Sequence, residues 1–187
     1  GNPKGVTHSF NTTLPACRIL NDAMEVTEDE IFLVYLPLGL NWGYLTLVQS
    51  ILAGAKAVLL DRFRAPAALD LIERERVTAL NAAPSMLIEL LESPLFERYD
   101  TSSLSSVAGG GSATPPRAAR LFLDKVPESY PGAGWGPTET NSNGSACTGR
   151  PFRDKPGSAG FLHPTVELSV RDDEGNECAP GTPGRLW

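Results

Sequence analysis

The sequence predicts an α/β fold: a doubly wound, mostly parallel sheet with flanking helices, followed by a short all-β segment. Apolar runs of strand length alternate with segments of helical period through the first three quarters of the 187 residues. Strands covered on both faces read as continuous apolar runs, which is typical of a parallel sheet between helices. After residue 149 the helical period stops, and a strand-like alternation takes its place.

Each apolar run is assigned to a strand, and each segment between two runs to a helix. The predicted strands are residues 31–36, 57–60, 77–80 and 104–108. The predicted helices are residues 45–52, 66–76, 84–91 and 115–122. Gly54 ends the first of these helices, and a proline opens each of the other three, as expected for a residue with a fixed φ and no N–H.

The change in pattern after residue 149 predicts a boundary between two units. Residues 1–149 form the α/β subdomain, which is expected to be incomplete at its N-terminus, and residues 150–187 begin a β-rich subdomain. Within the second unit, residues 166–170 alternate as a strand does. Asp173, Glu174 and Gly175 then supply a turn to a short following strand.

Composition excludes several classes of function. The net charge is −6, which argues against a nucleic-acid-binding protein because such proteins neutralise rows of phosphates with basic side chains. No apolar run is long enough to cross a bilayer, and no signal peptide is expected. The three cysteines suit neither a zinc site nor a disulfide framework, so reduced thiols in a cytoplasmic protein are predicted.

Ligands of open parallel sheets bind beyond the carboxyl ends of the strands, where three unusual segments are expected to fall. Residues 2–8 carry Lys4 in a glycine loop leading into a helix, so backbone N–H groups and the ammonium can hold phosphate. Residues 109–116 contain consecutive glycines, which let a flat ring or a phosphate approach the backbone. Taken alone, the first segment is better explained as a surface turn, and the second suits a turn and a ligand loop equally. The second also lacks the spacing of a dinucleotide fingerprint.

The third segment, residues 132–140, is more specific. Trp135 lies between two glycines and can stack on a base, while Thr138 offers a hydroxyl to a phosphate. Glu139 offers a carboxylate to Mg²⁺, a cation that prefers oxygen ligands. The structural alternative is a buried tryptophan in a glycine-rich turn with a helix-capping threonine.

The order of these segments resembles the core motifs of the AMP-forming acyl-CoA synthetase family, an adenylate-forming family that includes luciferases and the adenylation domains of peptide synthetases. The matching motifs are NPKGV at 2–6, LPL at 36–38, GG at 110–111, GWGPTET at 134–140 and GRL at 184–186. The resemblance extends over essentially the whole chain. It implies an internal fragment of the large N-terminal domain, with residues 1–149 as its nucleotide- and acyl-binding subdomain.

The resemblance implies a two-step ligase reaction that uses ATP, Mg²⁺ and, as cosubstrate, CoA. A carboxylate attacks the α-phosphate of ATP to give an acyl-adenylate and pyrophosphate, and a thiol then displaces AMP. Lys4 in the phosphate loop, Thr138 near the α-phosphate and Glu139 as the metal ligand are the implied catalytic residues. The implied nucleotide contacts are Gly110, Gly111, Ser112, Ala113, Gly134, Trp135, Gly136, Pro137 and Thr138.

The acid is expected in a pocket formed by Leu40, Asn41, Trp42, Gly110 and Trp135. Two of these residues depart from the family pattern. Leu40 stands where an aromatic-gate histidine is often found, and Trp135 replaces a more common tyrosine while keeping a stacking face. Packing of a helix start explains residues 40–42 equally well.

The family also uses segments that lie outside these 187 residues, including a ribose-binding aspartate and a C-terminal domain with the adenylation lysine. The chain alone is therefore expected to make no acyl-adenylate at a useful rate, which acid-dependent ATP–pyrophosphate exchange would test. An exposed sheet edge predicts self-association, which light scattering would test against a monomer.

Several functions stay open at this point. A CoA ligase for fatty, aryl or other hydrophobic acids is the leading interpretation, and its partners are a small carboxylic acid, ATP and CoA. An adenylation domain that loads a carrier protein is the alternative within the family. A non-catalytic nucleotide-binding module and a purely structural α/β domain are the alternatives outside it.

Overall fold

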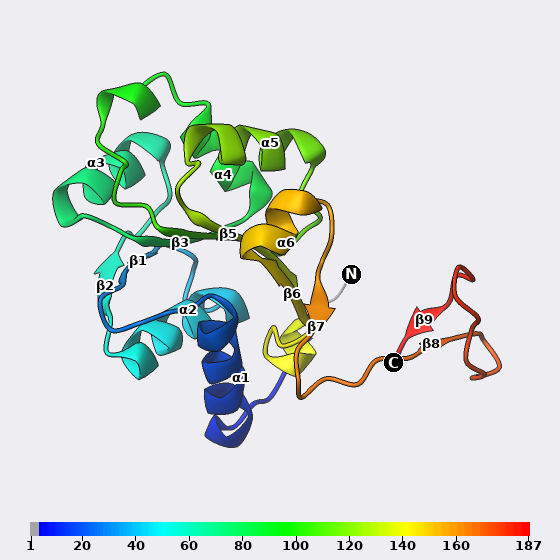
Figure 1. Cartoon of the computed structure of the whole chain (residues 1–187). Helices are drawn as coiled ribbons and strands as arrows, with labels where there is room; N and C mark the ends of the chain where they lie inside the picture. Colours follow the sequence, from blue (N-terminus) through cyan, green and yellow to red (C-terminus); the bar gives the residue numbers. More distant parts are fainter. Residues whose placement is uncertain (1–3) are drawn as a thin grey trace.

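The computed structural model describes residues 4–187 and contains a seven-stranded sheet of order β2-β1-β3-β4-β5-β6-β7 (Figure 1). Five strands run parallel: β1 (Ile31–Val34), β2 (Lys56–Leu59), β3 (Ala79–Ala82), β4 (Ser106–Gly109) and β5 (Tyr130–Trp135). Two antiparallel strands, β6 (Ser145–Thr148) and β7 (Phe161–Leu162), complete it. The predicted mostly parallel α/β sheet is confirmed.

Helices cover both faces of this sheet. The helices are α1 (Phe10–Ala23), α2 (Asn41–Ala53), α3 (Ala65–Glu75), α4 (Pro84–Leu91), α5 (Pro116–Lys125) and α6 (Gly149–Asp154), with the 3-10 turns η1 (Phe96–Arg98) and η2 (Thr138–Thr140). Figure 1 shows α3, α4 and α5 on one face, and α1 and α2 on the other. The chain is therefore doubly wound, as the alternation of apolar runs predicts.

The larger hydrophobic core lies under α3, α4 and α5. Leu69 and Ile72 of α3, Leu90 of α4 and Phe122 of α5 are each at most 2% exposed and pack there. Successive side chains of a strand point to opposite faces, so β1 serves both sides of the sheet. Leu33 enters the larger core, whereas Phe32 and Val34 form a second cluster on the face toward α2.

Three local predictions differ from the structure. Residues 132–135 belong to β5 rather than to a loop, because Ala133 and Trp135 pair with Cys147 and Ser145 of β6. The prediction of no helix after residue 149 is wrong for α6, a helix of only six residues that gives little periodic signal. The strand expected at 166–171 is limited to β8 (Val170–Arg171).

The C-terminal segment forms its own small sheet. β8 pairs antiparallel with β9 (Arg185–Leu186), and a turn at Asp173–Gly175 precedes a bridge from Arg171 to Glu177. Figure 1 shows this sheet apart from the seven-stranded one. α6 and β7 pack with the larger sheet, so the separate sheet begins at Val170, and a subdomain boundary at residue 149 stays a prediction.

Within residues 4–187, no helix combines the length and apolar character needed to span a bilayer. The three cysteines of the same part of the chain are free thiols, two of them buried.

The cysteines are expected to differ strongly in reactivity. Burial raises the pKa of the Cys17 thiol to about 12 and also raises the pKa of Cys147, whereas Cys178 is partly exposed. Because the thiolate is the nucleophile, iodoacetamide at pH 8 should modify Cys178 about 100-fold faster than Cys17. Peptide mass spectrometry over a time course measures both rates, and similar rates would contradict this burial.

Candidate functional site

The main cavity lies at the carboxyl ends of β3, β4 and β5 and has a volume of about 410 Å³. Residues 108–111 at the end of β4 and 133–138 at the end of β5 form one side of it. Leu20, Ala23 and Met24 of α1, and Trp42 and Gln49 of α2, also line it. The segments at 109–116 and 132–140 therefore meet at one cavity, as expected for the ligand-binding edge of a parallel sheet.

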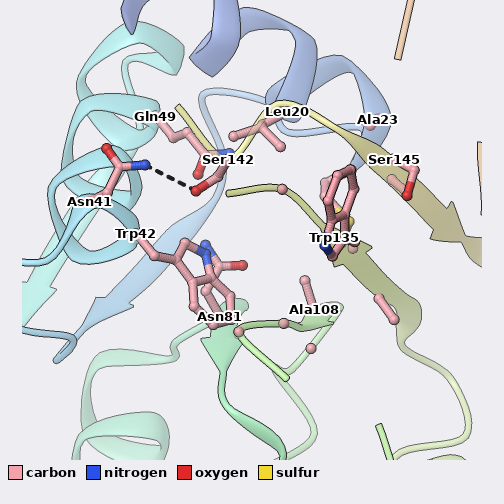
Figure 2. A pocket seen from close by; sticks show the side chains of 18 of the residues that line it. Leu20, Ala23, Asn41, Trp42, Gln49, Asn81, Ala108, Trp135, Ser142 and Ser145 are labelled. Atoms are coloured by element: carbon pink, nitrogen blue, oxygen red, sulfur yellow. Dashed lines mark hydrogen bonds between the residues drawn. The ribbon is translucent and has the colours of Figure 1, made fainter. Parts of the chain in front are cut away.

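Trp42 and Trp135 extend toward the main cavity from different elements, as Figure 2 shows. Trp42 lies in the first turn of α2, and Trp135 is the last residue of β5 and is 41% exposed. Asn41 donates a hydrogen bond to Ser142 Oγ at 3.1 Å, which joins the start of α2 to the loop after η2. The five residues expected to bind the acid, Leu40, Asn41, Trp42, Gly110 and Trp135, all line this cavity.

Gly110 and Gly111, which follow β4, pack against the indole ring of Trp42. A Cβ at Gly110 would lie 3.1 Å from Cη2 of Trp42, closer than side chains normally approach. Gly111 has φ +77°, a left-handed conformation that favours glycine. This part of the glycine segment is thus a platform for Trp42 as well as a wall of the cavity.

Residues 40–42 are held by tight packing at the start of α2. Leu40 is the N-cap of this helix, and a Cβ at Gly43 would lie 2.3 Å from the carbonyl oxygen of Pro37. Only glycine lets the helix begin so close to the chain that leaves β1. Residues 40–42 therefore both pack at the start of α2 and line the main cavity.

A second cavity, of about 400 Å³, lies beside the main one. Lys4, Gly5, His8 and Tyr44 line it, and three residues line both cavities: Leu40, Asn41 and Thr138. Thr138 thus lies at the junction of the neutral main cavity and the second cavity, which is lined by Lys4 with its ammonium group. The predicted residues Ser112, Ala113 and Glu139 line neither cavity, and residues 2–3 of the Lys4 motif lie outside the described residues.

Hydrogen bonds dock the N-terminal segment onto the Thr138 loop. His8 Nε2 lies 2.7 Å from the carbonyl oxygen of Thr138. Asn141 Nδ2 donates to the hydroxyls of Thr12 and Thr13 at 3.3 and 3.4 Å. No sequence pattern indicates the roles of His8 and Asn141, because each bonds to a residue about 130 positions away along the chain.

Asn141→Ala is expected to lower the free energy of unfolding by about 2 kcal/mol. The change removes both hydrogen bonds to α1 and places alanine at φ +55°, a conformation that asparagine tolerates better. Urea unfolding followed by circular dichroism measures the difference. Asn11→Ala, at an exposed position of α1, is the matched control, and an equal effect in both variants would contradict the docking role.

Glu139 is the one predicted metal ligand, and its donor set suits Mg²⁺. It is an exposed carboxylate in η2, next to Thr138. Residues 4–187 contain no cluster of three or more His, Cys, Asp or Glu side chains that could hold a metal ion. Mg²⁺ commonly binds through one or two carboxylates together with substrate phosphates and water, and Glu139 offers one carboxylate of this kind.

Comparison with known proteins now decides the family. The profile of one family, described as AMP-binding enzyme, matches residues 1–187. This chain belongs to the AMP-binding enzyme family. Among curated relatives, 4-coumarate--CoA ligase-like 9 of Arabidopsis thaliana is 31% identical over 100% of this chain and 34% of its own length. Acyl-CoA synthetase 7 of Caenorhabditis elegans is 29% identical over 82% of the chain and 28% of its own length.

Solved structures support the same family assignment. O-succinylbenzoate CoA synthetase from Bacillus subtilis, in complex with ATP and magnesium ion, has a TM-score of 0.87 and 28% identity over 100% of this chain and 38% of its own. The N-terminal domain of FACL13 from Mycobacterium tuberculosis has a TM-score of 0.85 and 25% identity over 95% of this chain and 44% of its own. The chain spans about a third of the length of the curated relatives it matches.

Proposed function

We propose that this chain is the nucleotide- and acid-binding part of an acid–thiol ligase, an AMP-forming acyl-CoA synthetase. One observation carries the proposal: the main cavity, which has no charged lining side chain, meets the Lys4 cavity at Thr138. An acid with an apolar tail suits the first cavity, and a polyphosphate suits the second. Thr138 then stands where the carboxylate and the α-phosphate must meet.

The proposed reaction has two balanced steps. In the first, a carboxylate oxygen forms a bond to the α-phosphorus of ATP, and the bond to the bridging oxygen breaks to release pyrophosphate. In the second, the sulfur of CoA attacks the acyl carbon, loses its proton to solvent or a base, and displaces AMP. Mg²⁺, where bound, offsets the charge on the phosphate oxygens.

Each site residue has a role in this proposal. Trp135 flanks the adenine, and Gly110 and Gly111 supply backbone along the base and the acid. Thr138 donates its hydroxyl near the α-phosphate, and the exposed Lys4 attracts the outer phosphates across the second cavity. Glu139 would hold Mg²⁺. Ser112 and Ala113 stay proposed adenine contacts, at the exposed end of the glycine segment.

The relatives support CoA as the acceptor, because several carry names of CoA ligases or acyl-CoA synthetases. A different acceptor has support from one structural neighbour, the amide bond synthetase McbA from Marinactinospora thermotolerans, with 29% identity and a TM-score of 0.82. A carrier-protein thiol is the third candidate.

Two further features bear on where and how the protein works. The free thiols favour a cytoplasmic location. The exposed side chains of Phe161 and Leu162, on edge strand β7, favour self-association.

Calorimetric titration of the chain with AMP and with ATP plus Mg²⁺ tests the proposal. Weak binding is expected, and Trp135→Ala should remove it because the stacking face at the cavity is lost. Trp187→Ala is the matched control, since Trp187 is 67% exposed and lines neither cavity. Equal affinity of wild type and Trp135→Ala, or no nucleotide binding at all, would contradict this assignment of the site.

A further inference from the structure

Two buried amide side chains, Asn21 of α1 and Gln49 of α2, form a pair beside the main cavity. Asn21 is 8% exposed and Gln49 is 4% exposed. Asn21 Nδ2 donates to the main-chain oxygen of Gln49 at 3.1 Å, and Gln49 Nε2 donates to Asn21 Oδ1 at 3.0 Å. Gln49 lines the main cavity, as do Leu20 and Ser142 (Figure 2).

The hydrogen bonds fix which way each amide points. The main-chain oxygen of Gln49 only accepts, so the NH₂ group of Asn21 must face it. The Oδ1 atom of Asn21 then faces Gln49 and requires a donor, which is the NH₂ group of Gln49. The Oε1 atom of Gln49 is left over, and it accepts no hydrogen bond from residues 4–187.

The orientation of the side-chain amide of Asn81, near the end of β3, follows from the same reasoning. Thr46 donates its hydroxyl to the main-chain oxygen of Trp42 at 2.9 Å, so its oxygen accepts from Asn81 Nδ2, at 3.1 Å. Asn81 also lines the main cavity, and its Oδ1 atom has no donor within the described residues. Two amide oxygens of fixed orientation, one on α2 and one on β3, therefore belong to this cavity.

These two oxygens are open rather than sealed in the protein. In the described part of the chain, the enclosed side-chain nitrogen or oxygen atoms without a partner are Asn141 Oδ1 and His163 Nε2. The oxygens of Gln49 and Asn81 also lack a partner but are not enclosed. Each amide nitrogen already donates one of its two possible hydrogen bonds, whereas each oxygen accepts none, so the larger unmet need of these two side chains is for a donor.

The rest of the lining limits the ligand further. Among residues 4–187, no Asp, Glu, Lys, Arg or His side chain lines the main cavity, and Leu20, Met24 and Trp42 give it apolar walls. A charged ligand tail would lose its hydration there without gaining a counter-charge. A few polar groups placed in an apolar pocket fix the orientation and the identity of the ligand.

We infer that the acid bound here has an uncharged tail that carries a hydrogen-bond donor, a hydroxyl or an N–H, which donates to the amide oxygen of Gln49 or to that of Asn81. The inference rests on the proposed function, because it takes the main cavity as the acid site. Gln49 and Asn81 then determine specificity. A purely structural role of Gln49 explains its bond to Asn21 but leaves its oxygen without a use.

Matched pairs of acids test the inference. The chain is titrated, at saturating AMP, with 3-(4-hydroxyphenyl)propanoate, 3-(3-hydroxyphenyl)propanoate and 3-phenylpropanoate, and with 8-hydroxyoctanoate and octanoate. At least one hydroxylated acid should bind about tenfold more tightly than its parent acid. The variant that removes the accepting oxygen, either Asn81→Leu or the double variant Asn21→Ala/Gln49→Met, should reduce that preference to about twofold or less.

Ser50→Ala is the matched control, because Ser50 is a fully buried polar residue of α2 that does not line the main cavity. Thermal unfolding and AMP affinity show that each variant keeps its fold. Three results would overturn the inference and leave the proposed function in place. They are equal binding within every acid pair, a preference that survives in both variants, and AMP binding without acid binding. Failure of AMP to bind the wild-type chain would overturn the proposed function together with it.

Discussion

Gly136→Ala is expected to reduce the affinity for AMP about 100-fold or more, and so to remove measurable binding. A Cβ at residue 136 would lie 2.1 Å from the carbonyl oxygen of Ser142 and 2.3 Å from its carbonyl carbon. These are backbone atoms of a closed loop, in which the Ser142 N–H donates to the carbonyl oxygen of Pro137 at 3.0 Å.

The loop has little freedom to absorb this clash. Asn141 and Ser142 already adopt left-handed φ values of +55° and +59°. Residues 136–138 must therefore move, and they carry Thr138 out of the junction between the two cavities. Calorimetry with AMP measures the loss, and Gly157→Ala is the matched control because nothing lies within 4 Å of its added Cβ. Wild-type affinity in Gly136→Ala would contradict this account of the loop.

Phe122→Ala is expected to lower the free energy of unfolding by about 3–5 kcal/mol. Phe122 is 2% exposed and belongs to the larger core between α5 and the sheet. Removing its ring loses apolar burial and leaves a cavity that rigid neighbours cannot close. Small domains are stable by only about 5–15 kcal/mol, so this variant should unfold at much lower urea concentration.

Phe161→Ala is the control for the core prediction, because the same substitution is made at a side chain that is 77% exposed. Its free energy of unfolding should change by about 0.5 kcal/mol or less. Urea titrations of both variants, followed by circular dichroism, give the comparison. Similar losses in the two variants would contradict the placement of α5 on the sheet.

The elements that the sequence predicts well are those with a strong apolar pattern. β1 to β4 and α2 to α5 each combine a run of apolar residues with a proline or glycine at an end, and all eight are confirmed within a few residues. β5 was missed because its sequence, YPGAGW, has two glycines and a proline and little strand propensity. Pairing with β4 and β6 overrides that local preference.

The candidate site was predictable only where a short motif carries it. The sequence places Gly110, Trp135 and Thr138 at strand ends, and the structure brings them to one cavity. The side chains of Asn21, Gln49 and Asn81 carry no motif. Their importance comes from hydrogen bonds between separate elements, which leave Gln49 and Asn81 with one unpaired amide oxygen each. Only the folded chain brings these elements together, so the sequence does not reveal the unpaired oxygens.

The location of bound AMP tests the central claim most directly. In a ¹H–¹⁵N correlation spectrum titrated with AMP, the amide signals of Gly110, Gly111, Gly134 and Gly136, which line the main cavity, should show the largest shifts. The signals of Gly175 and Gly181, beside β8 and β9, should stay in place. Largest shifts at those two distant glycines, or none at the cavity, would contradict the assignment of this edge of the sheet as the adenylate site.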